Sequence, residues 1–150
     1  MSNNALGIQP FLTWSRAFII IAAVSGMLSV ALGAFAAHGL KAILSPSLLS
    51  TFQTGVTYQF IHTIALLFCA LLIRSTGDAN SQKTFHRAAI CFIIGILFFS
   101  GSLYALALTG VKWFGPITPL GGVMFMVGWG FLALAGYRMT DDTTKDGVNQ

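Results

Sequence analysis

The sequence predicts an all-α membrane protein whose four transmembrane helices form an antiparallel, up-down-up-down bundle with both termini in the cytoplasm. Three observations lead to this prediction. Only 8% of the 150 residues are charged, whereas soluble domains carry about a quarter. Four apolar stretches are long enough to cross a bilayer, and each lacks Asp, Glu, Lys and Arg. The basic residues between them are unevenly divided between the two sides of the membrane.

The composition also excludes several classes of protein. The chain is 55% hydrophobic with a mean hydropathy of +0.79, so most of its surface has to face lipid. Its formal charge of +4 comes from basic residues that are spread along the chain without forming a cluster. We therefore expect no nucleic-acid partner.

The first predicted span, 17–37, follows an N-terminal tail, 1–16, that is expected in the cytoplasm. Small residues recur in this span every four positions and predict one helix-packing face: Ser25, Ser29, Gly33 and Ala37. An alternative is a cleaved signal peptide, because 34–36 has the A-x-A pattern of a cleavage site. We favour an uncleaved helix, since a discarded peptide would need neither this length nor this pattern.

The second predicted span, 52–73, belongs to a helix that begins earlier, at Ser45 and Pro46, which read as an N-cap and a first-turn proline. The third span, 88–109, follows a possible cap at Asp78, Asn80 or Ser81. Gly101 and Ala105 give this span a pair of small residues at packing distance.

The fourth predicted span, 117–137, begins at Thr118, which is followed by a proline. Gly121, Gly128 and Ala135 recur every seven residues and predict one packing face. The transmembrane domain is thus expected over 17–139, followed by a disordered cytoplasmic tail over 140–150.

Orientation follows from the flanking lysines and arginines, which gather on the cytoplasmic side of membrane proteins. One side carries Arg16, Arg74, Lys83, Arg87, Arg138 and Lys145. The other carries only Lys41 and Lys112. This bias predicts that the termini and the middle loop are cytoplasmic.

The polar side chains of the spans fall at similar depths, in the half opposite the termini, when about 1.5 Å of rise is assigned to each residue. This candidate polar layer comprises His38, Tyr58, Gln59, His62, Ser100, Ser102, Tyr104 and Thr118. One interpretation is a network of hydrogen bonds that fixes helix register. The other is a small cavity for a ligand, solute or proton, with His62 as its titratable group.

No constellation in the sequence predicts a catalytic, metal or cofactor site. The spans contain no carboxylate, so acid–base pairs are missing from the membrane. The three histidines are predicted at different depths and cannot share a metal ion. We therefore expect neither an enzyme nor a metal or cofactor.

Five short sequence motifs occur together in a recognisable order: GAFAAHGL at 33–40, TYQFIH at 57–62, FFSGSLY at 98–104, ITPLGG at 117–122, and GW at 128–129. Together they resemble the YgdD/YwdK-like family of small bacterial membrane proteins. This resemblance implies a four-span protein of the bacterial inner membrane with no assigned biochemical function. It supplies no catalytic residues.

These observations favour a non-enzymatic accessory or scaffold component of a membrane assembly. Its expected partners are the lipid bilayer and either other membrane proteins or further copies of itself. The alternative is a homo-oligomeric channel or carrier for a small solute that uses the polar layer.

Overall fold

The computed structural model describes residues 3–146, with side chains over 13–139. The described residues form helices and short connections, with four helical segments long and apolar enough to cross a membrane, which confirms the predicted fold class. The elements follow in the order α1 (Asn3–His38), η1 (Leu40–Ala42), α2 (Pro46–Ser75), α3 (Ala79–Gly95), η2 (Ile96–Ser100), α4 (Gly101–Thr109), η3 (Lys112–Ile117) and α5 (Thr118–Asp146).

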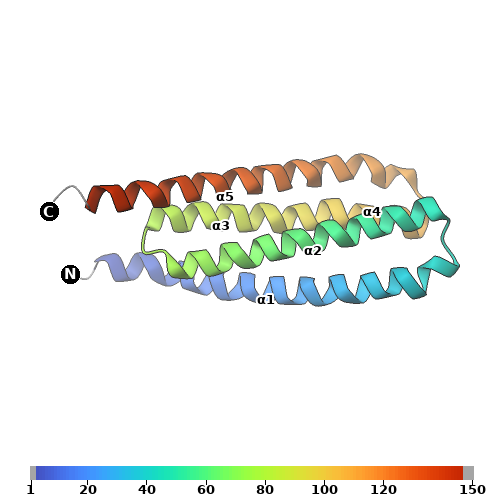
Figure 1. The fold of residues 1–150 in the computed structure, drawn as a ribbon, viewed down its shortest axis with the longest axis horizontal. Helices are drawn as coiled ribbons and strands as arrows, with labels where there is room; N and C mark the ends of the chain where they lie inside the picture. Colours follow the sequence, from blue (N-terminus) through green and yellow to red (C-terminus); the bar gives the residue numbers. More distant parts are fainter. Residues whose placement is uncertain (1–2, 147–150) are drawn as a thin grey trace.

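Successive spans run in opposite directions along one long axis (Figure 1). Both ends of the chain and the α2–α3 connection lie at one end of the bundle, which we call the terminal end. The η1 and η3 connections lie at the opposite end. The predicted N-terminal tail is part of α1, and α5 continues to Asp146, through part of the segment 140–150 for which we expected disorder. Residues 147–150 lie outside the described part of the chain.

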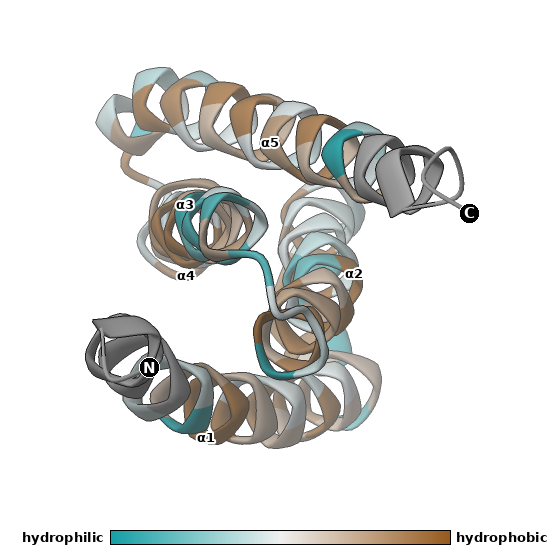
Figure 2. Cartoon of the chain, turned by 90° about the vertical axis from the view of Figure 1, so that its left-hand side faces the viewer, coloured by the Kyte–Doolittle hydropathy of each residue, from teal (hydrophilic) through white to brown (hydrophobic). Residues whose placement is uncertain are grey.

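The helices are arranged in three layers rather than around a closed square (Figure 2). The middle layer pairs α2 with the continuous helix α3–η2–α4, and α1 and α5 cover opposite sides of it. The main partner of α1 is α2, and the main partner of α5 is α3. Only 17% of the apolar window of each outer span is buried, against 44% for α2. The two outer helices therefore present most of their surface to lipid.

Two apolar clusters hold the layers together. The larger one lies in the half of the bundle near the terminal end and centres on Leu66, Phe92 and Phe125. The smaller one lies near the opposite end and centres on Phe52 and Leu40. Polar side chains of the spans lie between these two clusters, as described below.

Two helix starts follow the capping chemistry read from the sequence. The Ser45 hydroxyl accepts a hydrogen bond from the backbone N–H of Leu48, and Pro46 takes the first helical position of α2. The Asp78 carboxylate accepts one from the backbone N–H of Ser81 at 2.6 Å and caps α3. This bond lowers the pKa of Asp78, because it stabilises the charged form.

The third span contains a π-helical segment, η2, that the sequence did not predict. A π-helical turn holds an extra residue, so the helix changes the face that it presents to its neighbours. Before the segment, α3 packs mainly against α5; after it, α4 packs mainly against α2. The third span therefore packs against α5 with its first half and against α2 with its second half.

The small residues of α5 lie where this helix meets the third span. A methyl group at Gly121 would overlap the backbone nitrogen of Phe99. One at Gly128 would come within 2.7 Å of the Phe92 ring, and Ala135 is fully buried. The backbones of α5 and the third span can approach each other only because side chains are missing here.

Two of the predicted packing residues lie elsewhere. Ser25, Ser29 and Gly33 face α2, whereas Ala37 is exposed. The reason is geometric: each step of four residues turns about 40° beyond a full helical turn, so three steps rotate Ala37 by about 120°. Gly101 is also exposed, and a Cβ there would meet nothing within 4 Å, while Ala105 is half-buried.

Candidate functional site

Gln59 joins three helices near the middle of the bundle. Its side chain is only 5% exposed. The Nε2 atom donates to the backbone oxygen of Ser25 at 3.0 Å and makes a longer contact of 3.4 Å with the Ser25 hydroxyl. The Oε1 atom accepts a 2.7 Å hydrogen bond from the Tyr104 hydroxyl. One amide side chain therefore connects α1, α2 and α4.

Thr63 completes this group, which we call the Gln59 cluster: Ser25, Gln59, Thr63 and Tyr104. The hydroxyls of Ser25 and Thr63 lie 2.6 Å apart and share a hydrogen bond. The Tyr104 ring fits closely over α2 because Gly55 has no side chain; a Cβ there would come within 2.8 Å of the ring. The cluster pairs its buried polar atoms with one another, as burial in a lipid-facing protein requires.

His62 forms a second group with Trp129 and Phe125, the His62 cluster. Its Nδ1 lies 2.7 Å from the backbone oxygen of Tyr58, and the indole N–H of Trp129 donates to Nε2 at 3.2 Å. The imidazole stacks on the Phe125 ring, with centroids 3.4 Å apart and planes inclined by 8°. The cluster joins α2 to α5.

The two partners determine which nitrogen of His62 carries the proton. An indole N–H can only donate and a carbonyl can only accept, so Nδ1 is protonated and Nε2 is the acceptor. Both nitrogens are thus used in the neutral form. A second proton on Nε2 would point at the N–H of Trp129, so protonation requires Trp129 to move.

A third contact lies nearer the opposite end, between α4 and the start of α5. The Ser102 hydroxyl donates to the backbone oxygen of Phe99 at 3.0 Å and lies 2.7 Å from the Thr118 hydroxyl. Ser100, in the π-helical segment, is 1% exposed, and its hydroxyl has no hydrogen-bond partner among the described residues.

The candidate polar layer is thus divided into separate groups. His38 is exposed at the end of α1 and lies outside them. Tyr58 contributes its backbone oxygen and a ring that stacks on Phe99 at 4.5 Å, while 41% of its surface is exposed. The Phe92, Phe99 and Phe125 rings lie around His62 and Tyr58.

Several contributing residues were missed from the sequence. Trp129 is the partner of His62, although it was not among the residues of the predicted polar layer. An indole N–H within a transmembrane span has no water to bond to and requires an acceptor, which is the sequence signal for this residue. Near the terminal end, the Ser15 hydroxyl donates to the backbone oxygen of Ala70 at 2.7 Å, and Gln82 Nε2 donates to that of Thr76 at 2.9 Å. Ser15 and Gln82 lie outside the predicted spans 17–37 and 88–109, so the predicted polar layer does not include them.

Grooves flank the clusters, among them one beside Gln59 and one beside His62. The first, of about 510 Å³, lies between α1 and the third span, with Gln59 and Tyr104 among its lining residues. The second, of about 670 Å³, lies between α2 and α5 beside Tyr58, His62 and Trp129. Among the described residues, no group of three or more His, Cys, Asp or Glu side chains could hold a metal ion.

Comparison with known proteins gives one consistent family. Residues 32–122 match the family described as "Protein of unknown function (DUF423)". A "UPF0382 membrane protein" of Haemophilus influenzae is 45% identical over 122 residues, which cover 81% of this chain and 94% of that protein. The Bacillus subtilis "UPF0382 membrane protein YwdK" is 38% identical, over 82% of this chain and 98% of that protein.

The Escherichia coli "UPF0382 inner membrane protein YgdD" is 37% identical over 83% of this chain and 92% of that protein. No solved structure matches the chain. These matches confirm the resemblance inferred from the five sequence motifs. The chain is an all-α membrane protein that belongs to the DUF423 family of proteins of unknown function.

Proposed function

We propose that the protein is a non-enzymatic accessory or scaffold component of the bacterial inner membrane, with both termini in the cytoplasm. In this proposal it binds another integral membrane protein through the lipid-facing side of α5. The observation that carries the proposal is how the polar side chains inside the spans are used. Gln59, His62 and Tyr104 all form hydrogen bonds with other helices of the same chain. We take this use of the polar side chains to favour a role in holding helices together over a role in binding or converting a substrate.

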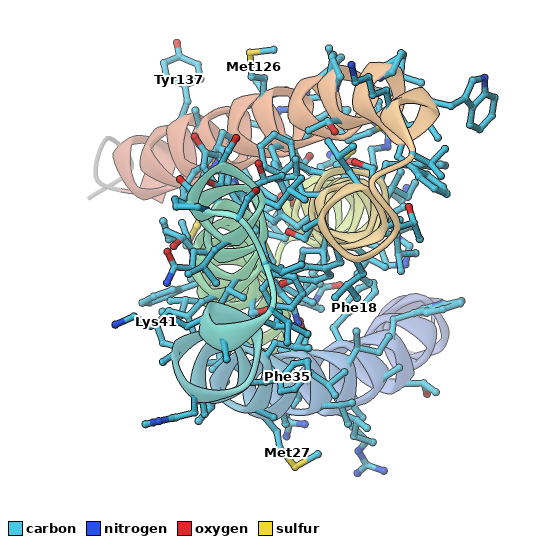
Figure 3. The ribbon with its side chains drawn as sticks, turned by 90° about the vertical axis from the view of Figure 1, so that its right-hand side faces the viewer. Phe18, Met27, Phe35, Lys41, Met126 and Tyr137 are labelled. Carbon is cyan, nitrogen blue, oxygen red and sulfur yellow. The ribbon has the colours of Figure 1, made fainter. Side chains whose placement is uncertain are left out.

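The exposed side of α5 has the features of a helix-binding surface. Met126 is 66% exposed and points away from the bundle (Figure 3). On the same side, Gly130 and Ala133 are exposed, and a Cβ at Gly130 would meet nothing within 4 Å. Small residues allow helices to approach closely in lipid, where hydrophobicity alone does not drive their association.

The proposed location and orientation rest on two further facts. The similar Escherichia coli protein carries the name "inner membrane protein". The basic residues of this chain gather at the terminal end, as the cytoplasmic side of a bacterial membrane protein requires.

The alternative, a homo-oligomeric channel or carrier, has less support. Large side chains, including Leu66, Ile73 and Phe85, fill the bundle between the polar groups and the terminal end. Both nitrogens of His62 are used in the neutral form, so a proton relay would need Trp129 to leave. A conducting path would have to form between copies.

The experiment is native mass spectrometry of the protein released gently from its own membrane at natural expression levels. We expect a stoichiometric complex with a second integral membrane protein. Gly130→Leu should dissociate this complex, because its side chain occupies the proposed contact. Gly101→Leu, the same exchange on the third span, should leave the complex intact. A wild-type protein that is released alone or only with copies of itself would contradict the proposal.

A further inference from the structure

The groove between α1 and the third span lies deep within the spans rather than at a membrane surface. Its walls come from α1 and from α3–η2–α4, and they include Ile20, Val24, Leu28, Ile93 and Leu97. The groove exists because α1 packs chiefly against α2 and only lightly against α3, so α1 and α4 remain apart. It opens sideways to the surface that faces lipid.

The chemistry of the groove calls for a hydrocarbon occupant. Its walls are aliphatic, and the lining polar side chains are Ser25, Gln59 and Tyr104, which bond to one another in the Gln59 cluster. A water molecule needs two to four polar partners and would find few here. Leaving the groove empty would cost the aliphatic walls their dispersion contacts.

The dimensions admit a hydrocarbon chain but not a helix. Along α1 the groove extends from Ile20 to Leu32, which is about 18 Å at the rise of an α-helix. The whole empty space, about 1050 Å³ with its open side included, gives a mean cross-section of at most about 58 Å² over that length. A helix with side chains, about 10 Å across, needs about 80 Å². A single hydrocarbon chain, about 5 Å across at van der Waals contact, needs roughly 20 Å².

The flanking charges indicate from which end such a chain enters. Arg16 lies one helical turn before Ile20 on α1, and Arg87 lies less than two turns before Ile93 on α3. Both arginines are exposed, and each precedes the first groove residue of its helix on the side toward the terminal end. Basic side chains at a membrane surface attract anionic lipid headgroups. The terminal end of the groove therefore suits a phosphate-bearing headgroup.

We propose that this groove binds one acyl chain of a membrane phospholipid, with the phosphate headgroup at the terminal end beside Arg16 and Arg87. The bound chain fills the space that α1 and α4 leave open and covers the Gln59 cluster. This lipid site lies on the opposite side of the middle layer from α5, so it does not depend on the partner surface proposed there.

Gly101 permits a specific test. It lines the groove, and a Cβ at this position meets nothing within 4 Å, so the side chain of a Gly101→Leu variant enters the groove without strain. Gly130→Leu is the matched control, because Gly130 is equally open but lies on α5 outside the groove. Both exchanges raise helix propensity to the same degree, and thermal unfolding of each variant verifies that the bundle is intact.

The proteins are reconstituted in vesicles of phosphatidylethanolamine and phosphatidylglycerol, released into mild detergent and weighed by native mass spectrometry. We expect one phospholipid per wild-type chain, a several-fold lower occupancy in Gly101→Leu, and unchanged occupancy in Gly130→Leu. No retained phospholipid in the wild type, equal retention in both variants, a retained prenyl lipid, or a dimer without lipid would each overturn the proposal.

A second measurement keeps the wild-type protein in its bilayer. A phosphatidylglycerol with a photoreactive diazirine in its acyl chain is activated in the vesicles, and the modified residues are identified by peptide mass spectrometry. We expect labelling concentrated on Val24, Leu28 and Leu97, which falls in Gly101→Leu. Labelling spread equally over the exposed residues of α1 and α5 would contradict a defined site.

Discussion

At the scale of single residues, a missing side chain sets the separation of two helices at Gly121. The backbone of the π-helical segment lies where a methyl group at Gly121 would be, and the clash would be with backbone rather than with the tip of a movable side chain. Relief of such a clash requires a helix to shift, and well-packed interiors resist such shifts.

We predict that Gly121→Ala lowers the free energy of unfolding by about 1 to 3 kcal/mol, the usual cost of overpacking. Gly130→Ala, which meets no neighbour within 4 Å, should leave the stability unchanged or slightly raised. Both values come from circular dichroism during titration of the detergent-solubilised protein with a denaturing detergent. Equal stability of the two variants would mean that α5 is free to move away from the third span.

The residue scale also shows how far the sequence allowed the site to be predicted. The depths of Gln59, His62 and Tyr104 in the membrane follow from counting residues along each span, which places them in the predicted polar layer. Their hydrogen-bond partners depend on the rotation of each helix and on which helices are neighbours. For that reason the sequence does not identify Trp129 of α5 as the partner of His62 of α2.

At the scale of elements, the four spans and the caps of α2 and α3 could be predicted, because apolar length and capping chemistry are local properties. The π-helical segment could not be predicted from the sequence. Its residues, Ile96–Ser100, are as apolar as those of an ordinary transmembrane helix. The segment packs against α2 and α5, and such contacts between distant parts of the chain are not visible in the local sequence.

The Asp78 cap gives the element-scale prediction. The backbone N–H of Ser81 lowers the carboxyl pKa of Asp78. The contribution of Asp78 to the free energy of unfolding is therefore complete above the unfolded-state pKa of about 3.9. It is lost as the pH falls through the folded-state pKa. Asp78→Ala should cost about 0.5 to 2 kcal/mol at neutral pH. The difference between wild type and Asp78→Ala should shrink in acid below about pH 4.

Unfolding titrations at several pH values measure both effects. Asp78→Asn is the control, since asparagine caps as well as aspartate without titrating. The stability difference between Asp78→Asn and Asp78→Ala should stay constant with pH. A pH dependence equal to that of the wild type would assign the effect to another group.

At the scale of the whole molecule, the alternation of helix directions was predictable because the connections are short. The three-layer arrangement was not, since a closed square would satisfy the same connections. The hydrogen bond from Trp129 to His62 distinguishes the two arrangements, because it joins the second span to the fourth and these spans are diagonal in a closed square. Its geometry depends on the placement of several helices together.

Orientation is tested at this scale by cysteine labelling, after Cys69 and Cys91 are replaced by alanine. Lys41→Cys and Lys112→Cys mark the end opposite the termini, and Gly77→Cys marks the terminal end. In intact spheroplasts a membrane-impermeant maleimide should label the first two sites, because they face outwards in the proposed orientation. Gly77→Cys should react only after permeabilisation. The reverse pattern would place both termini outside the cell.

The layered arrangement has a consequence for how the chain is made. α1 packs mainly against α2 and α3 mainly against α5, so principal contacts join spans that follow one another during synthesis. Ser25, Gln59 and Thr63 can find each other once the first hairpin has left the ribosome. His62 is different, because its Nε2 acceptor stays unpaired until Trp129, on the last helix, has entered the membrane. The arrival of α5 therefore satisfies the last acceptor of the His62 ring, and a nascent chain truncated before α5 carries an unpaired polar atom in an apolar setting, at a cost of about 1 to 3 kcal/mol.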